Sequence, residues 1–415
     1  MTHRDLYELG ESPPLGHVPK WMHAAVIRPS RYGEPAHAYQ DEVIEVPRVG
    51  PRQLLVQVMA AGVNYNGVWT SLAKPVDMIA MRQKRGEPED FHVGGSEGSG
   101  VVWAVGSEVK GLAVGDPVTL SPCRWDEHAS DIRLGADPIT SSTRTVWGYE
   151  ANYGCFAQFT VVDEYQCFRK PPQLTWEQAA VSMASFGTAY RQLRGWPPNV
   201  VRPGDPVLIW GGAGGLGAAA IQIVREFGGL PVAVVSSVDR AAYCRKLGAV
   251  GVIDRTQFDH WGRLPAVGSP EFERWLSGAR AFGKKFWEVL GERRNPAIVF
   301  EHSGEDTLPT SVFMCDSAGM VVVCAGTSGY NCDLDVRVLW MRQKRLQGSH
   351  SASTRESAEV LRLIGDGRLD PCLTRTWRFH EVGEAHQLMY ENRHSLGNAA
   401  LLVNAPKEGL RDLPG

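Results

Sequence analysis

Cysteine is scarce in this chain of 415 residues, which contains eight. None of them forms a Cys-x-x-Cys pair, and the closest spacings join Cys315, Cys324 and Cys332. This pattern disfavours a disulfide scaffold and a zinc ribbon, and it fits free thiols in a reducing compartment. We therefore expect a soluble, cytoplasmic protein.

Long apolar runs and a strong net charge are also missing. No uninterrupted apolar stretch approaches the roughly 20 residues of a membrane-spanning helix, and the polar residues 1–16 contain no signal-peptide core. Lys and Arg number 43 against 46 Asp and Glu, which gives a net charge of −3. No overall basic field is therefore expected to hold nucleic acid or an anionic membrane.

Two different patterns of apolar and turn residues along the chain predict an α/β protein of two domains. Residues 1–192 contain short β-rich runs between Gly and Pro turns, which is typical of a barrel-like β domain. Residues 193–347 repeat a Val- and Ile-rich strand followed by a helix, which predicts a doubly wound parallel sheet. Residues 348–415 hold an amphipathic helix and one last strand, and we expect them to return to the first domain because one strand builds no core. Within the sheet domain, residues 255–295 are interpreted as an insertion, and the expected strands are 207–210, 231–237, 251–254, 297–302 and 320–326.

A glycine-rich turn follows the strand at 207–210 and opens the next helix. Glycines in GxGxxG spacing permit a tight turn and a close approach of the backbone to a pyrophosphate, which the helix N-terminus attracts through its dipole. The alternative is a turn without a ligand, but the order of strand, turn and helix favours a dinucleotide site. The candidate cofactor contacts in the turn are Gly212, Gly214, Gly215, Leu216 and Gly217.

The end of the next strand distinguishes the two nicotinamide cofactors. An NAD enzyme carries an acidic residue there, about 20 residues after the turn, to bind the ribose hydroxyls. This chain has Ser236 and Ser237 instead, followed by Arg240, and a guanidinium beside hydroxyl groups suits a 2′-phosphate. Asp239 lies past the strand and is expected to cap the following helix. The sequence therefore predicts NADPH in preference to NADH.

A β domain on both sides of a Rossmann domain is the layout of the medium-chain dehydrogenase/reductase superfamily. Its zinc alcohol dehydrogenases place zinc ligands in the segments that match Asn64-Tyr65-Asn66 and Gly95-Ser96-Glu97. Both segments here carry groups that bind Zn²⁺ poorly, and the structural cluster of four cysteines is lacking. We expect a reaction without a metal, with hydride transfer to an activated C=C bond.

Within that superfamily the chain resembles the crotonyl-CoA carboxylase/reductases, which join a GroES-like β domain to the Rossmann domain. The resemblance covers nearly the whole chain and includes the runs VNYNGVWTSLAKPV (63–76), VWGYEANYGCFAQF (146–159), GTAYRQL (187–193), LIWGGAGGLG (208–217), CAGTSGY (324–330) and LWMRQKRLQGSH (339–350). It implies reductive carboxylation, in which NADPH gives hydride to the β-carbon of a 2-enoyl-CoA. The α-carbon of the enolate then attacks CO2 and gives an alkylmalonyl-CoA, which can supply polyketide assembly.

The family holds CO2 and excludes water with an Asn, a Phe, a Glu and a His. Asn66, Glu150 and His350 match three of them, and Tyr149 stands where the family usually has Phe. The Asn66 amide can donate to a CO2 oxygen, and Glu150 with His350 can order a water molecule. From the residues alone, Asn66 could be a turn former, Glu150 a solvated loop acid and His350 a capping or core histidine.

Tyr149 leaves two functions open. If its hydroxyl faces the α-carbon, it can hold water or donate a proton, and plain reduction of the enoyl-CoA is favoured. If the hydroxyl turns away, the aromatic shield is kept. A further alternative is a non-catalytic NADPH-binding protein like the crystallin-type relatives of the superfamily, against which Asn66, Glu150 and His350 argue.

The remaining candidates lie in or near the matched runs. Thr188 and Gly326 are expected at the cofactor. Arg337 and Lys344 are expected to bind the phosphates of CoA, although a solvated helix face is an alternative for Lys344. Trp340 and Met341 are interpreted as core or interface residues, since the resemblance implies a homo-oligomer, either a dimer or a tetramer.

Overall fold

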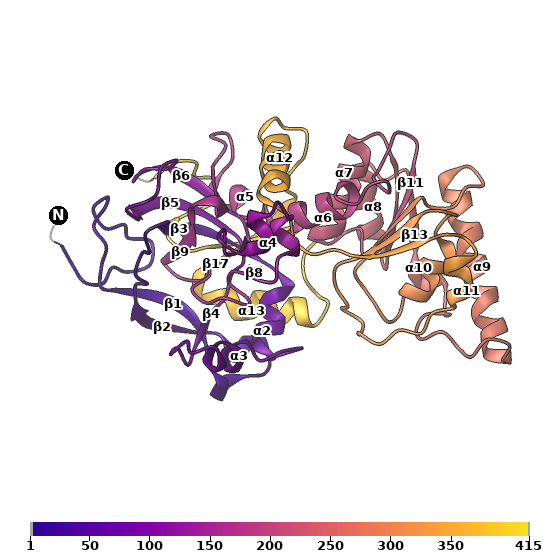
Figure 1. Cartoon of the computed structure of the whole chain (residues 1–415), viewed down its shortest axis with the longest axis horizontal. Helices are drawn as coiled ribbons and strands as arrows, with labels where there is room; N and C mark the ends of the chain where they lie inside the picture. The colour runs from indigo at the N-terminus through magenta and orange to yellow at the C-terminus, as the bar shows by residue number, and fades with distance from the viewer. Residues whose placement is uncertain (1–2, 414–415) are drawn as a thin grey trace. The chain divides into compact units, whose positions relative to one another are not determined.

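The computed structural model describes residues 3–413, which form two compact units (Figure 1). The first unit runs to Ala184 and resumes at Ala352, and the second comprises Ser185–Ser351. Both boundaries differ from the expected 192/193 and 347/348. Helix α6 (Ala184–Arg194) belongs largely to the second unit, because Gln192 Nε2 donates to the carbonyl oxygen of Val322 at 3.2 Å.

The first unit is mainly β-structure. Its strands are β1 (Trp21–Ile27), β2 (Gln40–Glu45), β3 (Gln53–Val63), β4 (His92–Val93), β5 (Gly98–Val105), β6 (Pro117–Leu120), β7 (Cys123–Arg124), β8 (Thr145–Val146), β9 (Phe159–Asp163), β10 (Cys167–Arg169), β17 (Leu373–Arg378) and β18 (Asn398–Leu402). Its helices are α1 (Pro35–Ala38), α2 (Tyr65–Ser71), α3 (Met78–Lys84), α4 (Ser130–Arg133), α5 (Trp176–Ala180), α12 (Thr354–Gly365) and α13 (Val382–Tyr390).

Strand β3 organises the first unit. Its eleven residues are almost entirely buried, which suits the sequence QLLVQVMAAGV, whose only polar side chains are Gln53 and Gln57. It pairs antiparallel with β5, with β9 along its first half and with β18 along its second half. The large sheet has the order β10-β6-β5-β3-β18-β17, and a smaller sheet has the order β2-β1-β4. The final strand thus lies beside β3, so the C-terminal segment completes the sheet that the N-terminal segment began.

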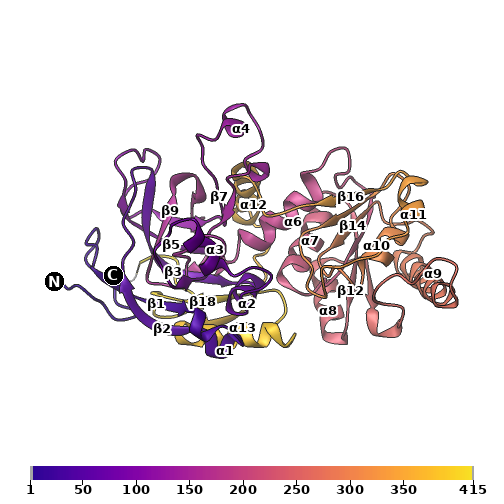
Figure 2. The same cartoon turned by 60° about the horizontal axis from the view of Figure 1, so that its bottom comes forward.

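The second unit is a six-stranded parallel sheet covered by helices. Its strands are β11 (Pro206–Ile209), β12 (Leu230–Val235), β13 (Gly251–Asp254), β14 (Ile298–Glu301), β15 (Met320–Val323) and β16 (Arg345–Gly348), and its further helices are α7 (Gly215–Glu226), α8 (Val238–Leu247), α9 (Pro270–Leu290), α10 (Leu308–Met314) and α11 (Val336–Trp340). The strand order is β13-β12-β11-β14-β15-β16. The chain adds β12 and β13 on one side of β11 and then β14, β15 and β16 on its other side, so the strand order reverses between β11 and β14. Figure 2 shows α7 and α8 on one face of this sheet and α9 and α10 on the other. In such sheets, ligands bind beyond the carboxyl ends of the strands at the reversal point.

Two elements of the second unit were not predicted. Helix α9 occupies most of the presumed insertion, with Ser269 as its N-cap and Gly291 in the left-handed conformation at its end. Its buried side chains recur at helical spacing, as Phe272, Trp275, Ala279, Phe282 and Phe286, so the periodicity was present in the sequence. Strand β16 is polar, as RLQG, because it is an edge strand that pairs only with β15.

Two further findings concern the surroundings of the chain. None of the helices within residues 3–413 combines the length and the apolar character needed to cross a bilayer. All eight cysteines lie in the described part of the chain and carry free thiols, five of them buried.

Candidate active site

The glycine turn between β11 and α7 is built from contacts that leave no room for side chains. A Cβ atom on Gly217 would lie 2.3 Å from the carbonyl oxygen of Gly211, and one on Gly212 would lie 2.7 Å from Cβ of Ala233. Gly214 is the N-cap of α7, and the nearest atom to its Cβ position is 3.7 Å away. No side chain caps this helix, so its first N–H groups are available to an anion. The turn therefore has the geometry of a pyrophosphate site.

His302 supports the start of this turn, and sequence analysis missed it. Its Nε2 lies 3.0 Å from the carbonyl oxygen of Trp210, and its ring fills the space beside Gly211, which has φ +57°. Burial lowers the pKa of His302, so the imidazole is neutral and donates its Nε2–H to Trp210. The signal was a histidine directly after a buried strand of the sheet.

Glu301, the residue before His302, is fully buried and ties the loop after β14 to β11. Its Oε1 accepts hydrogen bonds from the Ser303 amide and the Thr307 hydroxyl, both at 2.8 Å. Its Oε2 accepts from the hydroxyl of Ser311 at 2.5 Å, and that hydroxyl accepts from Trp210 Nε1 at 2.8 Å. The two strands at the reversal point are thereby held in one hydrogen-bonded network.

Ser236 and Arg240 lie together after β12, as a 2′-phosphate site requires. Arg240 Nη1 is 3.5 Å from the Ser236 hydroxyl, and Ser236 is exposed. The predicted cap was wrong, because Ser237 and not Asp239 is the N-cap of α8, its hydroxyl accepting from the Arg240 amide at 3.4 Å. Asp239 lies in the first turn of that helix. The hydroxyl hydrogen of Ser237 still leaves a donor for a ligand.

Thr188 and Gly326 occupy different parts of the second unit. Thr188 is half-buried on α6. Gly326 follows β15, and its Cα lies 2.9 Å from the Cβ position of Gly304, the loop residue after β14. Gly326 thus belongs to the carboxyl edge of the sheet, together with the glycine turn.

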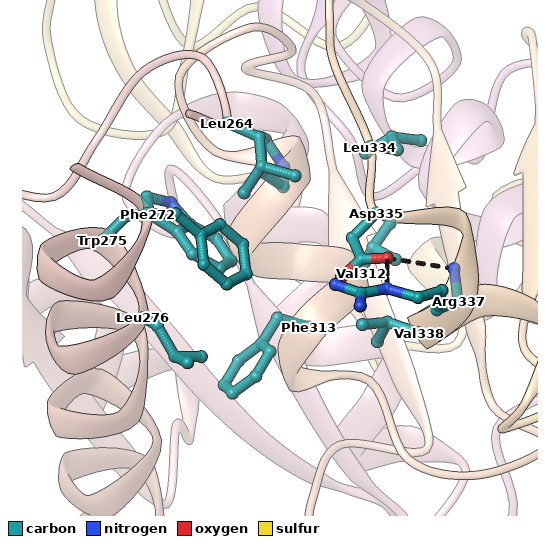
Figure 3. Close-up of a pocket in the computed structure, with 11 residues that line it drawn as sticks. Leu264, Phe272, Trp275, Leu276, Val312, Phe313, Leu334, Asp335, Arg337 and Val338 are labelled. Carbon is teal, nitrogen blue, oxygen red and sulfur yellow. Dashed lines mark hydrogen bonds and ion pairs between the residues drawn. The ribbon is translucent and has the colours of Figure 1, made fainter. Parts of the chain in front are cut away.

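Arg337 lies beside an apolar cavity of about 220 Å³ formed by α9, α10 and α11 (Figure 3). Its guanidinium forms two hydrogen bonds with Asp335, at 2.9 and 2.8 Å, and half of the side chain is exposed. The cavity is lined by three aromatic rings together with aliphatic side chains, namely Phe272, Trp275, Phe313, Leu264, Leu276, Pro309, Val312, Leu334 and Val338.

Lys344 does not offer its ammonium group to a phosphate. Its Nζ donates to the carbonyl oxygens of Val312 and Phe313 at 2.7 and 3.1 Å, in the last turn of α10. Burial lowers the pKa of this lysine. A cation at a helix C-terminus satisfies carbonyl groups that have no partner within the helix. Lys344 is therefore a helix-capping residue, which corrects its predicted role in binding CoA.

The first unit brings Asn66, Tyr149 and Glu150 into one neighbourhood. Asn66 Nδ2 donates to the hydroxyl of Ser96 at 3.2 Å. The turn at Gly148 packs against the same segment, since a Cβ on Gly148 would lie 3.0 Å from the Ser96 amide nitrogen. Trp69, one helical turn after Asn66 on α2, has its ring 6.3 Å from that of Tyr149. An amide donor and an aromatic wall are thus placed side by side.

Glu150 closes the turn that carries Tyr149. Its Oε2 accepts from the backbone N–H of Val146 at 2.7 Å and from Arg144 at 3.3 Å, and the side chain is 24% exposed. His350, by contrast, is exposed and belongs to the second unit, two residues after β16. The four predicted catalytic residues are therefore distributed as three in the first unit and one in the second.

Buried side chains that sequence analysis missed support this turn from behind. His92 is fully buried, and its Nε2 lies 3.4 Å from the carbonyl oxygen of Gly148. Burial lowers the pKa of His92 to about 3, so the ring is neutral. Asn152 joins the other side of the loop, where its Oδ1 accepts from the Val93 amide at 2.8 Å.

The two segments that match the zinc-ligand positions lie against each other. Asn64 Nδ2 donates to Glu97 Oε1 at 2.8 Å, and Asn66 Nδ2 donates to the hydroxyl of the neighbouring Ser96, so two hydrogen bonds join the same two segments. Within residues 3–413, no group of three or more His, Cys, Asp or Glu side chains is arranged to hold a metal ion.

Comparisons with known proteins agree with this architecture. The model of the alcohol dehydrogenase GroES-like domain matches residues 50–172, and that of the zinc-binding dehydrogenases matches residues 215–366. The crotonyl-CoA carboxylase/reductase of Cereibacter sphaeroides is 48% identical over 408 residues, which cover 98% of this chain and 94% of that protein. The chain belongs to the crotonyl-CoA carboxylase/reductase family. The expected family and fold class are thereby confirmed.

Solved structures of carboxylase/reductases superpose on nearly all of this chain. Crotonyl-CoA carboxylase/reductase AntE in complex with NADP has a TM-score of 0.95 and 64% sequence identity, covering 98% of this chain and 100% of that one. The 2-octenoyl-CoA carboxylase reductase CinF in complex with NADP and 2-octenoyl-CoA has a TM-score of 0.88 and 34% identity, covering 95% of this chain and 91% of that one.

Proposed function

We propose that this protein is an NADPH-dependent enoyl-CoA carboxylase/reductase. It reduces a 2-enoyl-CoA, such as crotonyl-CoA or a longer or branched analogue, and carboxylates the product at the α-carbon. The observation that carries the proposal is the cluster of Asn66, Tyr149 and Glu150 in a chain that aligns over almost its full length with a crotonyl-CoA carboxylase/reductase. The product is an alkylmalonyl-CoA, the chemical class of a polyketide extender unit.

The second unit fits a phosphorylated dinucleotide. The turn at Gly217 admits a close approach of backbone to pyrophosphate, and Arg240 beside Ser236 suits a 2′-phosphate. When bound, NADPH supplies a hydride. This hydride adds to the β-carbon of the substrate, and the electron pair of the C=C bond moves to the α-carbon and the thioester as an enolate.

The first unit determines what happens to the enolate. Its α-carbon either forms a C–C bond with CO2, which becomes a carboxylate, or takes up a proton. Asn66 uses one amide N–H on Ser96 and has a second N–H for a CO2 oxygen. Tyr149 and Trp69 place aromatic surface beside this amide, which keeps water away from the carbanion. Glu150 holds the turn that carries Tyr149 by accepting from the Val146 amide.

CoA is held through Arg337 in this proposal. The guanidinium exchanges its two hydrogen bonds with Asp335 for a nucleotide phosphate, and the neighbouring aromatic cavity accepts apolar surface. We propose a cytoplasmic location, which the eight free thiols support because such thiols fit a reducing compartment.

A homo-oligomer is the proposed assembly, formed across the edge strand β16. Trp340 is 60% exposed and Met341 is 70% exposed, so neither belongs to the core of one chain. Large exposed apolar side chains beside an unpaired strand edge fit pairing with a second copy of the chain.

The first experiment is NADPH oxidation with crotonyl-CoA, with and without saturating bicarbonate, followed by mass analysis of the product. We expect ethylmalonyl-CoA to predominate when bicarbonate is present. Butyryl-CoA as the main product would identify a plain enoyl-CoA reductase. An absence of enoyl-CoA-dependent oxidation would favour a non-catalytic NADPH-binding protein.

The same assay tests Tyr149. In Tyr149→Phe, the ratio of ethylmalonyl-CoA to butyryl-CoA is expected to stay equal or rise, because the change removes a hydroxyl that can hold water while keeping the ring. Tyr153→Phe is the control, since its hydroxyl contacts Glu89 at 3.3 Å, outside the cluster of Asn66. A fall in the ratio that is specific to Tyr149→Phe would show that the hydroxyl itself assists carboxylation.

Cofactor choice is expected to depend on Arg240. Arg240→Ala should raise the Kd for NADPH by about tenfold or more, because a charge-assisted hydrogen bond to the 2′-phosphate is lost. The Kd for NADH should stay nearly unchanged, since NADH has no 2′-phosphate. Arg245→Ala is the matched control, because Arg245 is exposed in the last turn of the same helix. Fluorescence titration measures both constants. Equal losses for NADPH and NADH would contradict a 2′-phosphate contact.

A further inference from the structure

Glu97 is a buried carboxyl group that has no cationic partner among the residues that the structure describes. It stands directly before β5 and is 1% exposed. Its Oε1 accepts from Asn64 Nδ2 at 2.8 Å, and its Oε2 accepts from the backbone N–H groups of Met183 and Ala184 at 3.0 and 2.8 Å. Burial raises the pKa of this carboxyl, and among the described residues only these neutral donors oppose the rise. A carboxylate kept in this way needs a reason beyond stability, since burial without a counter-ion is costly.

The side chain of Asn64 bonds to Glu97 and does not cap its own helix. It is the N-cap of α2, a position where the asparagine side chain normally accepts a hydrogen bond from the first turn of the helix. Here it makes no such bond and donates to Glu97 instead. Gly62 provides the space, since a Cβ there would lie 2.6 Å from Glu97.

The bond from Asn64 is one half of a double clamp on the loop that carries Asn66. Ser96 accepts from the Asn66 amide at 3.2 Å, and its neighbour Glu97 accepts from the Asn64 amide at 2.8 Å. Both ends of the segment Asn64-Tyr65-Asn66 are therefore fixed to consecutive residues. The direction of the remaining Asn66 N–H depends on both bonds.

The other carboxylate oxygen holds the chain where α6 begins. Met183 and Ala184 present their N–H groups in the first turn of this helix, where a negative charge is favourable. Glu97 thus joins two segments that are far apart in sequence, the Asn66 loop and the last residues of the first unit.

We infer that Glu97 is a positioning residue, which fixes the Asn66 loop against the start of α6 through Asn64 and so controls the fraction of turnover that ends in carboxylation. The inference rests on the proposed function of Asn66. It concerns a residue that contacts neither the substrate nor the cofactor. Its readout is therefore the product ratio and not NADPH binding.

The test is a suppressor pair. Asn64→Asp places two carboxylates at the distance of the present hydrogen bond, which disrupts the bridge. We expect the ratio of ethylmalonyl-CoA to butyryl-CoA to fall by at least about tenfold, equivalent to about 1.4 kcal/mol. In Asn64→Asp/Glu97→Gln, the Gln oxygen accepts from Met183 and Ala184 and its amide donates to Asp, so the ratio should return to within about threefold of the wild type.

Glu177→Gln is the matched control. Glu177 is a buried glutamate of the same unit, 4% exposed, whose Oε1 accepts from the Gly409 amide at 2.7 Å, away from the Asn66 loop. It should change thermal stability without changing the product ratio. A double variant no better than Asn64→Asp, or a wild-type ratio in Asn64→Asp, overturns the inference. If the wild type itself yields only butyryl-CoA, the proposed carboxylation fails instead, and the positioning role then requires the same loss and rescue in kcat for reduction.

Discussion

Gly217→Ala is expected to destabilise the second unit and to weaken NADPH binding by about tenfold or more, whereas Gly214→Ala is expected to fold normally. A Cβ on Gly217 would lie 2.3 Å from the carbonyl oxygen of Gly211 and 2.6 Å from Cα of Gly212. These are backbone atoms, so no side chain can rotate away. Overpacking costs about 1–3 kcal/mol where side chains can adjust, and here the cost should reach or exceed that range.

Gly214→Ala separates binding from folding. Its Cβ position is 3.7 Å from the nearest atom, an ordinary contact, so the thermal midpoint should change little. The same Cβ lies at the N-cap of α7, where a pyrophosphate approaches the backbone, so NADPH affinity should still fall. Thermal unfolding and NADPH fluorescence titration of both variants provide the measurements. A normal midpoint and normal affinity in Gly217→Ala would refute the proposed nucleotide turn.

Acid is expected to unfold the first unit steeply between about pH 6 and 4, because two of its buried histidines resist protonation. Burial lowers the pKa of His92 to about 3 and that of His386 to about 4. His386 is enclosed by Tyr39 and Phe156, with its Nδ1 on the Val382 carbonyl at 2.7 Å.

The sign of this effect follows from proton linkage. Below its ordinary pKa of about 6.5, a histidine exposed in the unfolded chain binds a proton. The same histidine stays unprotonated when it is buried in the folded chain. The free energy of unfolding is therefore undiminished by these histidines above that pKa. It falls as the pH drops from that value toward the pKa of each histidine in the folded chain. Each site contributes about 1.4 kcal/mol per pH unit, and the two together contribute about 3 kcal/mol per unit. Glu97, whose pKa is raised by burial, acts in the opposite sense and offsets part of the loss.

The slope of the unfolding free energy against pH, from denaturant titrations between pH 6.5 and 4.5, measures this effect. His386→Asn removes one titrating ring while its amide can still donate to Val382, so the slope should fall by about 1.4 kcal/mol per pH unit. His380→Gln, an exposed position in the same unit, is the control. An unchanged slope in His386→Asn would show that the buried ring does not control acid unfolding.

Local sequence was sufficient for the central strands and the nucleotide turn. Strands β11, β12, β14 and β15 are runs of mainly apolar residues that are buried almost throughout, so each is recognisable from its own residues. Gly217 is required by a contact within a short segment, since a Cβ atom there would lie 2.3 Å from the carbonyl oxygen of Gly211. Edge strand β16 was missed because its sequence, RLQG, contains a single apolar side chain, Leu346, and so shows no apolar run.

The candidate site was predictable residue by residue but not as an arrangement. Asn66 and Tyr149 could be named from family runs, yet Ser96, which receives the Asn66 amide, carries no local mark of its role. His302 behind the glycine turn is marked only as a histidine directly after a buried strand, which does not indicate its contact with Trp210. These residues act through partners distant in sequence, and no local pattern records such contacts.

The partners of charged and polar side chains were the features that the sequence predicted least well. Lys344 has the sequence character of a phosphate ligand, but its ammonium is held by the carbonyls that end α10. Ser237 rather than Asp239 caps α8, because the helix begins at Val238 and Asp239 already lies in its first turn. Glu97 is named in the sequence only as part of a segment that matches a zinc-ligand position, and it is a buried acceptor of three hydrogen bonds. Residue type specifies which bonds a polar group can make, whereas the packing of distant segments specifies which partner it meets.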